Sequence, residues 1–95
     1  MKSVYHQPEV VHCKKEQCTV YIGRGSKWGN PFKIGPDGSR YQVIEKYRQW
    51  IQLPEQQHLI DSLDELTGQL LGCYCSPDDC HGDVLVELWR THVNN

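Results

Sequence analysis

The sequence predicts a small α/β fold, in which a small three-stranded sheet (a hairpin plus one parallel βαβ crossover) packs against about three helices. Three observations support this prediction. Short apolar runs typical of strands occur at 9–13, 18–23 and 69–75; β-branched and aromatic residues dominate the second, and the third is apolar on both faces. Helical periodicity lies between the second and third runs and returns after residue 80. A chain of 95 residues, 38% of them hydrophobic, suits a single compact domain over residues 1–95.

The first two strands are expected to pair directly with each other. The four polar residues 14–17 between them suit a hairpin loop. The second strand ends at Gly23, and residues 23–39 hold five glycines and two prolines, which argue against a regular element. Trp28 and Phe32 within this segment indicate an ordered loop, because disordered segments are poor in aromatic residues.

Capping signals and apolar periodicity place the helices. Ser39 and the glutamine three residues later form a capping box that begins a helix over about 40–52. Pro54 suits the first turn of a second helix. Asp78 or Asp79 is a suitable N-cap for a third. The apolar faces of the first and third helices are Val43, Ile44, Tyr47, Trp50 and Ile51, and Val84, Leu85, Leu88, Trp89 and His92.

Charge and composition exclude several classes of protein. The net charge is -2 and the isoelectric point is about 6.2, so no global basic field attracts nucleic acid. No run approaches the roughly 20 apolar residues that a membrane span needs. The N-terminal residues also lack the apolar segment of a signal peptide. We therefore expect a cytoplasmic protein without a membrane partner, whose five cysteines are reduced.

Two short segments hold most of the chemically capable side chains, and each follows a predicted strand. They are residues 23–32 and residues 73–83. Helical sequence separates them, so their strands are expected to run in parallel as a βαβ unit. Loops that leave the carboxyl ends of parallel strands line a common crevice where ligands bind. The sequence therefore predicts a cleft formed by both segments.

The first segment has the residue types of an anion-binding loop. Arg24 and Lys27 are expected to hold an anion, with Ser26 between them and glycines that let backbone N–H groups approach a phosphate. Trp28 is expected to stack on a base or sugar, and Asn30 to read a polar edge. An alternative is equally open. In it, Trp28 and Phe32 fold back onto the core and Arg24 pairs with Asp83.

The second segment allows three interpretations. In the first, the helix start lowers the pKa of the Cys80 thiol, and His81 and Asp83 act as its proton partners in catalysis. In the second, Cys73, Cys75, Cys80 and His81 bind zinc, although their spacing is uncommon for such a site. In the third, the cysteines are small buried hydrophobic residues and the loop only caps a helix.

Both segments resemble a known family. The matching residues include Val20-Tyr21-Ile22-Gly23-Arg24, residues 26–32, Gly72-Cys73-Tyr74-Cys75 and residues 80–85. Over most of residues 9–89 the chain resembles small phage and bacterial proteins grouped as the domain of unknown function 4326. The resemblance implies a stand-alone domain of phage or other mobile genomes. It implies no reaction, cofactor or catalytic residue.

The residues favour a function in ligand binding. We expect a pocket for a nucleotide-like or other phosphorylated small molecule, with or without a reaction at Cys80. One alternative is a zinc-stabilised interaction module or a single-stranded nucleic-acid binder without catalysis. Another is a protein that sequesters a signal nucleotide without turning it over. The sequence assigns neither a cofactor nor an oligomeric state.

Overall fold

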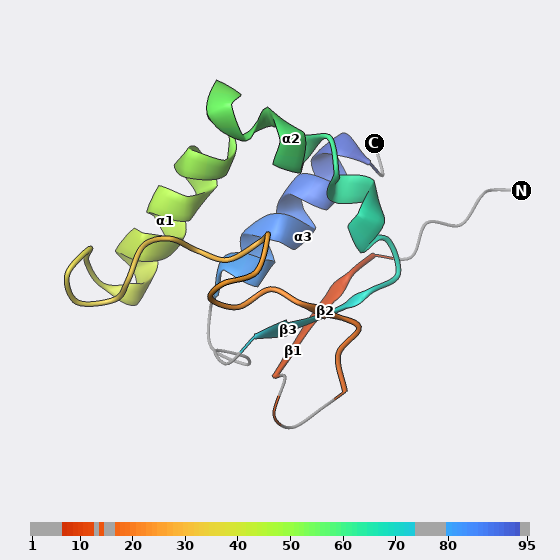
Figure 1. Cartoon of the computed structure of the whole chain (residues 1–95), viewed down its shortest axis with the longest axis horizontal. Helices are drawn as coiled ribbons and strands as arrows, with labels where there is room; N and C mark the ends of the chain where they lie inside the picture. The colour runs from red at the N-terminus through yellow and green to blue at the C-terminus, as the bar shows by residue number, and fades with distance from the viewer. Residues whose placement is uncertain (1–6, 13, 15–16, 74–79, 94–95) are drawn as a thin grey trace, which may run out of the picture.

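Three parallel strands form the sheet of this protein (Figure 1). The computed structural model describes residues 7–12, 14, 17–73 and 80–93. The strands are β1 (Glu9–His12), β2 (Val20–Tyr21) and β3 (Leu70–Cys73). β3 pairs with both of the others, so the strand order is β1-β3-β2. The last strand along the chain is thus the central strand of the sheet.

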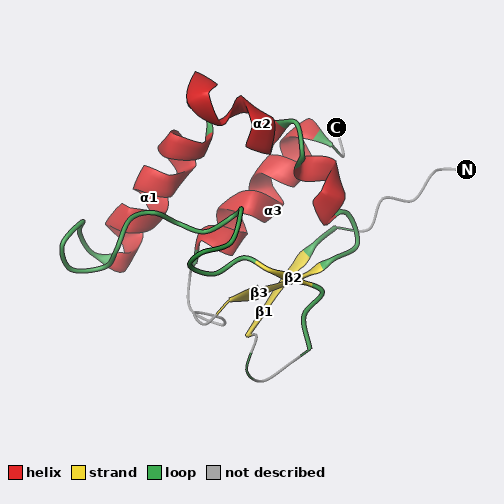
Figure 2. Ribbon diagram, in the orientation of Figure 1, coloured by secondary structure: helices red, strands yellow, loops and turns green. Residues whose placement is uncertain are grey.

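The helices lie to one side of the strands (Figure 2). They are α1 (Arg40–Ile51), α2 (Gln57–Ile60) and α3 (His81–His92), with the 3-10 turns η1 (Pro54–Gln56) and η2 (Leu63–Leu66) on either side of α2. A three-stranded sheet with three helices confirms the predicted α/β fold class. Among the described residues, none of the helices has the length and apolar character needed to cross a membrane.

The predicted hairpin between the first two strands is wrong. β1 pairs in parallel with β3, with Val10 opposite Leu71, and β2 pairs in parallel with the other edge of β3, with Val20 opposite the same leucine. The physical reason is burial. The run of β3 is apolar on both faces and three of its four residues are buried, so this strand takes the central position, where a neighbouring strand covers each of its edges.

The capping box predicted for α1 is present. The Ser39 hydroxyl oxygen accepts from the Gln42 backbone N–H at 3.2 Å, and the Gln42 side chain accepts from the Ser39 N–H at 2.8 Å. The box starts the helix at Arg40, as the sequence predicts. The helix predicted to begin at Pro54 is divided into the short elements η1, α2 and η2.

Alternate residues of the strands face the helices and form the core. Leu71 is fully buried between Val10 and Val20, which are partly buried, and Ile22 continues this face beyond β2. The helices contribute the largest fully buried side chains of the core, Trp89 and Tyr47. Burial of each large side chain stabilises the fold by about 1.5–3 kcal/mol.

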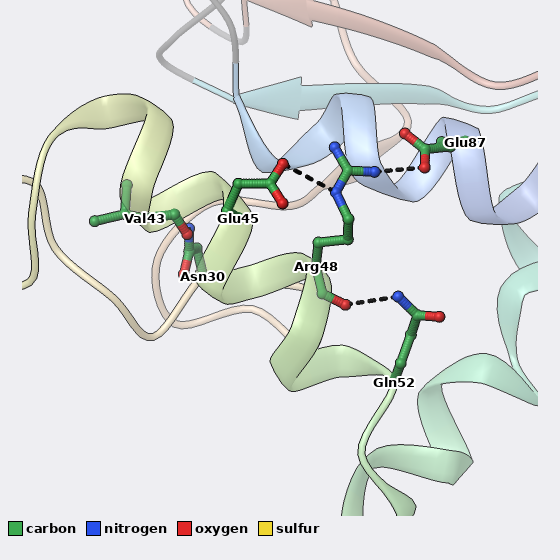
Figure 3. A network of polar contacts seen from close by, with 6 residues as sticks. All are labelled: Asn30, Val43, Glu45, Arg48, Gln52 and Glu87. Carbon is green, nitrogen blue, oxygen red and sulfur yellow. Dashed lines mark hydrogen bonds and ion pairs between the residues drawn. The ribbon is translucent and has the colours of Figure 1, made fainter.

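Arg48 connects α1 to α3 across the helix layer (Figure 3). Its guanidinium group pairs with Glu45 on its own helix and with Glu87 on α3. The Gln52 side chain also donates to the Arg48 carbonyl oxygen at 2.8 Å, at the end of α1. Partly exposed ion pairs contribute only about 0–1 kcal/mol each, so this network fixes how the two helices lie more than it stabilises them.

Gly82 lets the first turn of α3 lie against the sheet. A Cβ atom there would lie 2.8 Å from Ile22 Cδ1 and 2.9 Å from Val10 Cγ2. Ile22 is fully buried and cannot withdraw. Overpacking of this kind costs about 1–3 kcal/mol, whereas alanine gains about 1 kcal/mol over glycine in helix propensity.

The net effect is centred at about 1 kcal/mol, so we expect Gly82→Ala to lower the free energy of unfolding by about 1 kcal/mol, measured by urea denaturation. Gln49→Ala on the exposed side of α1 is the control and should change stability by less than about 0.5 kcal/mol. A Gly82→Ala protein as stable as the wild type would show that the helix does not depend on this close approach.

Candidate functional site

Both predicted segments line one pocket at the carboxyl edge of the sheet. The pocket has a volume of about 490 Å³. Gly23, Arg24 and Asn30 come from the loop after β2, and Cys73 and His81 come from the end of β3 and the start of α3. The loop around Ile34 and the first turns of α1 complete the wall. The predicted juxtaposition of the two segments is therefore present in the fold.

The described lining of this pocket is positively charged. Arg24, Lys33 and Arg40 line it, and none of the described residues that line it is acidic. The chain as a whole carries a net charge of -2, so this local charge is opposite in sign to that of the chain. Arg24 itself makes no ion pair with any described residue. The pocket therefore offers cationic donors where an anion can enter.

Aromatic and aliphatic side chains form the other walls. Tyr21 is 41% exposed and lies over Gly23, where an added Cβ atom would come within 2.2 Å of the tyrosine hydroxyl. Phe32 also lines the pocket, and the Lys46 ammonium group is 5.8 Å from its ring centroid. Ile34 is half exposed. A ligand would therefore meet flat apolar surfaces beside the cations.

Asn30 ties the pocket loop to α1 (Figure 3). Its side-chain amide donates to the Val43 carbonyl oxygen at 3.2 Å, and its side-chain oxygen accepts from the Phe32 N–H at 2.9 Å. The sequence predicts Asn30 as a ligand-binding residue, and it does line the pocket. Both ends of its amide are already engaged, so its observed contacts hold the loop in shape.

Trp28 lies in the core, with 3% of its surface exposed. Its carbonyl oxygen accepts from the Tyr47 hydroxyl at 2.7 Å in a buried hydrogen bond. The predicted stacking of this ring on a ligand therefore lacks an accessible ring face, and the alternative in which Trp28 folds back onto the core describes its position. The exposed aromatic ring at the pocket is Tyr21 instead.

Lys27 and Ser26 do not line this pocket. The Lys27 ammonium group is 3.0 Å from Glu65 and 5.2 Å from the Trp28 ring centroid. The Ser26 hydroxyl donates to the Gly23 carbonyl oxygen at 2.6 Å. Ser26 lines a separate, smaller cavity of about 240 Å³, which Arg24 also lines. Of the two basic residues predicted to hold an anion, the structure places only Arg24 in the pocket.

Cys80, and not Asp78 or Asp79, is the N-cap of α3; the two aspartates lie outside the described residues. Its sulfur accepts from the Gly82 N–H at 3.2 Å, and its own N–H donates to the Asp83 carboxylate at 3.1 Å. This reciprocal arrangement is a capping box with cysteine in the place of serine. Asp83 therefore has a structural contact, and the predicted pair with Arg24 is not formed.

The pKa of Cys80 shifts in the opposite direction from the one predicted. Its sulfur lies 3.1 Å from that of Cys73, and the residue is 2% exposed. The hydrogen bond with Cys73 and burial raise the pKa of Cys80 far above the ordinary value of a thiol. These effects exceed the opposing hydrogen bond from the Gly82 N–H. The described structure thus holds Cys80 as a neutral thiol, which does not favour an activated nucleophile.

Only two of the four predicted zinc ligands are seen with their sulfur atoms close together. Cys73 and Cys80 lie together, but Cys75 falls outside the described residues, and the His81 Nε2 atom is engaged with a carbonyl oxygen. Across the described part of the chain, no three side chains of metal-ligating type gather around one point. Zinc binding stays a prediction.

His81 is a buried histidine at the pocket. It is 8% exposed, and its Nε2 atom lies 2.6 Å from the Ile22 carbonyl oxygen. The ring also meets the Tyr47 ring edge-on, with centroids 5.0 Å apart. Burial lowers the pKa of His81, and the bond to Ile22 only partly opposes this shift. The imidazole is therefore neutral near pH 7 and joins β2 to α3.

Arg40 and Tyr21 line the pocket but were not among the residues that sequence analysis selected. Each had a weak signal. Arg40 directly follows the N-cap of the helix that the loop enters, and Tyr21 stands two residues before the glycine that ends the strand. Neither position identifies a pocket residue until the strand order is known.

The buried bond between Tyr47 and the Trp28 carbonyl supports the pocket loop. Tyr47→Phe leaves that carbonyl oxygen buried without its donor, so we expect the free energy of unfolding to fall by about 1–3 kcal/mol. Tyr41→Phe removes the hydroxyl of a tyrosine that is 73% exposed and is the matched control. Urea denaturation of both variants measures the difference. Equal stabilities would mean that the loop does not depend on this bond.

Folding stability should decrease in mild acid because His81 is neutral in the folded state. Its pKa is lowered by burial, whereas the unfolded chain binds the proton at the ordinary histidine pKa of about 6.5. Below that pH the unfolded state binds more protons, so stability falls as pH falls. The stability of the wild type relative to His81→Gln should therefore fall between about pH 7.5 and about pH 5.5. A constant difference in denaturation experiments would contradict the neutral state.

Comparison with known proteins gives relatives of undescribed activity. The family model of the domain of unknown function 4326 matches residues 8–91. Uncharacterized protein R718 of Acanthamoeba polyphaga mimivirus is 36% identical over 93 aligned positions, which cover 79% of this chain and 69% of the viral protein. An uncharacterized 12.4 kDa protein in the nrdA-td intergenic region of Enterobacteria phage T4 is 37% identical over 82 positions, covering 83% of this chain and 74% of the phage protein.

No solved structure matches the chain. The family match spans both segments of the pocket and every strand and helix described above except the last residue of α3. The resemblance seen in the sequence is therefore confirmed: the chain belongs to the family of the domain of unknown function 4326.

Proposed function

We propose that the pocket binds a nucleotide-like small molecule, a planar ring system that carries a phosphate. One observation carries the proposal: three basic side chains, and no acidic one among the described lining residues, surround a pocket whose other walls are apolar. Its volume of about 490 Å³ lies within the ~300–1,000 Å³ typical of small-molecule sites.

The basic residues have separate parts in this proposal. Arg24 can bind a phosphate through two parallel N–H donors of its guanidinium group, which is the strongest arrangement for such an anion. Lys33 and Arg40 add positive charge to the same wall. Three like charges around one pocket attract an anion together more strongly than a single exposed cation does.

The apolar walls suit the planar part of the ligand. Tyr21 and Phe32 line the pocket, and an aromatic ring can stack on any nucleobase because every base has a flat face. A single-stranded nucleic acid would use the same two forces, but it also needs a basic groove that follows its backbone. The net charge of -2 and the gathering of the basic residues around one pocket favour a small ligand.

Binding without covalent chemistry is the form of the proposal that the site supports. Cys80, the predicted nucleophile, is buried and neutral. His81 and Asp83 are both engaged in structural hydrogen bonds. A protein that binds or sequesters a nucleotide needs none of these residues as a nucleophile.

Adenosine monophosphate, ribose 5-phosphate and adenosine, tested by isothermal titration and thermal shift, separate the contributions. We expect the nucleotide to bind most tightly, because only it fills both the cationic and the apolar parts of the pocket. Arg24→Gln should weaken nucleotide binding roughly 10- to 100-fold, as loss of a charged hydrogen bond costs about 1.5–3 kcal/mol.

Lys27→Gln is the matched control. Lys27 lies in the same loop as Arg24 and carries the same charge, but it pairs with Glu65 and does not line the pocket. Its affinity should stay within about twofold of the wild type. Equal losses in both variants would indicate a diffuse effect of charge. Absence of binding by every phosphorylated probe would remove the proposed function.

A further inference from the structure

We propose that His81 contacts the bound ligand, with its Nδ1 atom accepting a hydrogen bond from a hydroxyl or N–H group of that ligand. The inference rests on the proposed function and narrows its substrate class. The oxygens of a phosphate bound by Arg24 accept hydrogen bonds at neutral pH and do not donate them. The partner of Nδ1 must therefore be another group on the same molecule, such as a ribose hydroxyl or a ring amine.

The hydrogen bond to Ile22 fixes which nitrogen carries the proton. A carbonyl oxygen can only accept, so the Nε2 atom, 2.6 Å from it, must be the donor. The neutral ring has one proton on nitrogen, and that proton is on Nε2. Nδ1 therefore presents a lone pair, and His81 can only accept hydrogen bonds at this atom.

Nδ1 has no hydrogen-bond partner among the described residues. The residue is nevertheless only 8% exposed. No buried side-chain nitrogen or oxygen in the described part of the structure lacks a partner, so this unpartnered atom must reach open space. His81 lines the pocket. We take this pocket as the space that Nδ1 reaches, so that a bound ligand supplies its partner.

The ring is held rigidly for such a contact. Tyr47 packs edge-on against it at an interplanar angle of 75°, and the Tyr47 hydroxyl is itself fixed by the Trp28 carbonyl. His81 is also the first residue of α3, directly after the N-cap Cys80 and within the capping box. A binding group whose position is fixed before the ligand arrives loses little conformational entropy when it binds.

Two substitutions separate the Ile22 contact from the pocket contact. The terminal amide of glutamine reaches the position of Nε2, so His81→Gln can still donate to the Ile22 carbonyl but leaves no acceptor at the place of Nδ1. The shorter asparagine side chain places its amide near Nδ1 and does not reach Ile22. Each variant therefore keeps one of the two contacts of the histidine.

We expect opposite results from this pair at about pH 8, where histidine is neutral in both the folded and unfolded chain. His81→Gln should unfold within a few degrees of the wild type but bind adenosine monophosphate at least tenfold more weakly. His81→Asn should unfold at a lower temperature yet, at a temperature where it is folded, bind the nucleotide within a few-fold of the wild type. Normal binding by His81→Gln would overturn the inference and leave the proposed function standing.

The ligand group is identified with the 2′,3′-dideoxy form of the same nucleotide. If a ribose hydroxyl is the donor, the dideoxy form binds the wild type as weakly as His81→Gln binds the full nucleotide. If the amino group on the base is the donor, the dideoxy form binds the wild type well and binds His81→Gln more weakly than the wild type. If none of the nucleotides binds the wild-type protein, both the proposed function and this inference are wrong.

The pH dependence of affinity gives an independent readout. Among the described residues, the ionisable and charged groups near the ring or around its pocket are Tyr47 on α1, Cys73 on β3, Cys80 and Asp83 at the start of α3, and the lining residues Arg24, Lys33 and Arg40. If Nδ1 accepts from the ligand, protonation of His81 weakens binding, so affinity falls in acid relative to His81→Gln. If a charged imidazole instead meets the phosphate, affinity rises in acid relative to that variant, and the inference is wrong.

The nitrogen chemical shifts of His81 test the tautomer directly. An unprotonated Nδ1 and a protonated Nε2 are expected without ligand, and the Nδ1 resonance should move when the nucleotide is added. A proton on Nδ1 in the unliganded protein would overturn the inference, whatever the affinities of the variants.

Discussion

The hydrogen bond from His81 Nε2 to the Ile22 carbonyl joins the two parts of the site. Ile22 ends the strand run from which the pocket loop departs, and His81 begins α3. The two residues are 59 positions apart in the sequence. Gly82, which follows, lets the helix lie against Ile22 and Val10. Without this contact, the end of β2 and the start of α3 would share an edge of the sheet but not a fixed geometry.

The pocket loop has no regular structure and depends on a few anchors. Fixing the backbone of each residue costs about 1–2 kcal/mol of conformational entropy, so a loop of this length needs strong contacts to be ordered. Trp28 is buried in the core, its carbonyl is bonded to Tyr47, and Asn30 is bonded to the Val43 carbonyl. Both hydrogen bonds are to residues of α1. They leave Arg24 and Phe32 at the pocket and explain why aromatic residues occur in a glycine-rich segment.

The sequence predicts those features that depend on local pattern. The capping box at Ser39 and the strand character of β3 are local, and both are confirmed. The meeting of the two segments follows from one general rule on parallel strands, which holds here. The hairpin was wrong because loop length is local information, whereas the choice of partner for β1 depends on the burial of a strand some sixty residues away. Trp28 and Cys80 are residue types that serve equally in sites and in cores, so their burial could not be read from their identity.

The neutrality of the buried groups is consistent with an anionic ligand. A thiolate at Cys80, or at any position beside the pocket, would repel a phosphate and would reduce the attraction of Arg24 and Lys33. The hydrogen bond with Cys73 and burial raise the pKa of Cys80, so this charge does not arise near pH 7. Burial likewise keeps His81 uncharged, which leaves the described cations of the pocket as the source of its charge. The site thus separates attraction of the anion, by exposed basic side chains, from recognition of the rest of the molecule, by a fixed neutral acceptor.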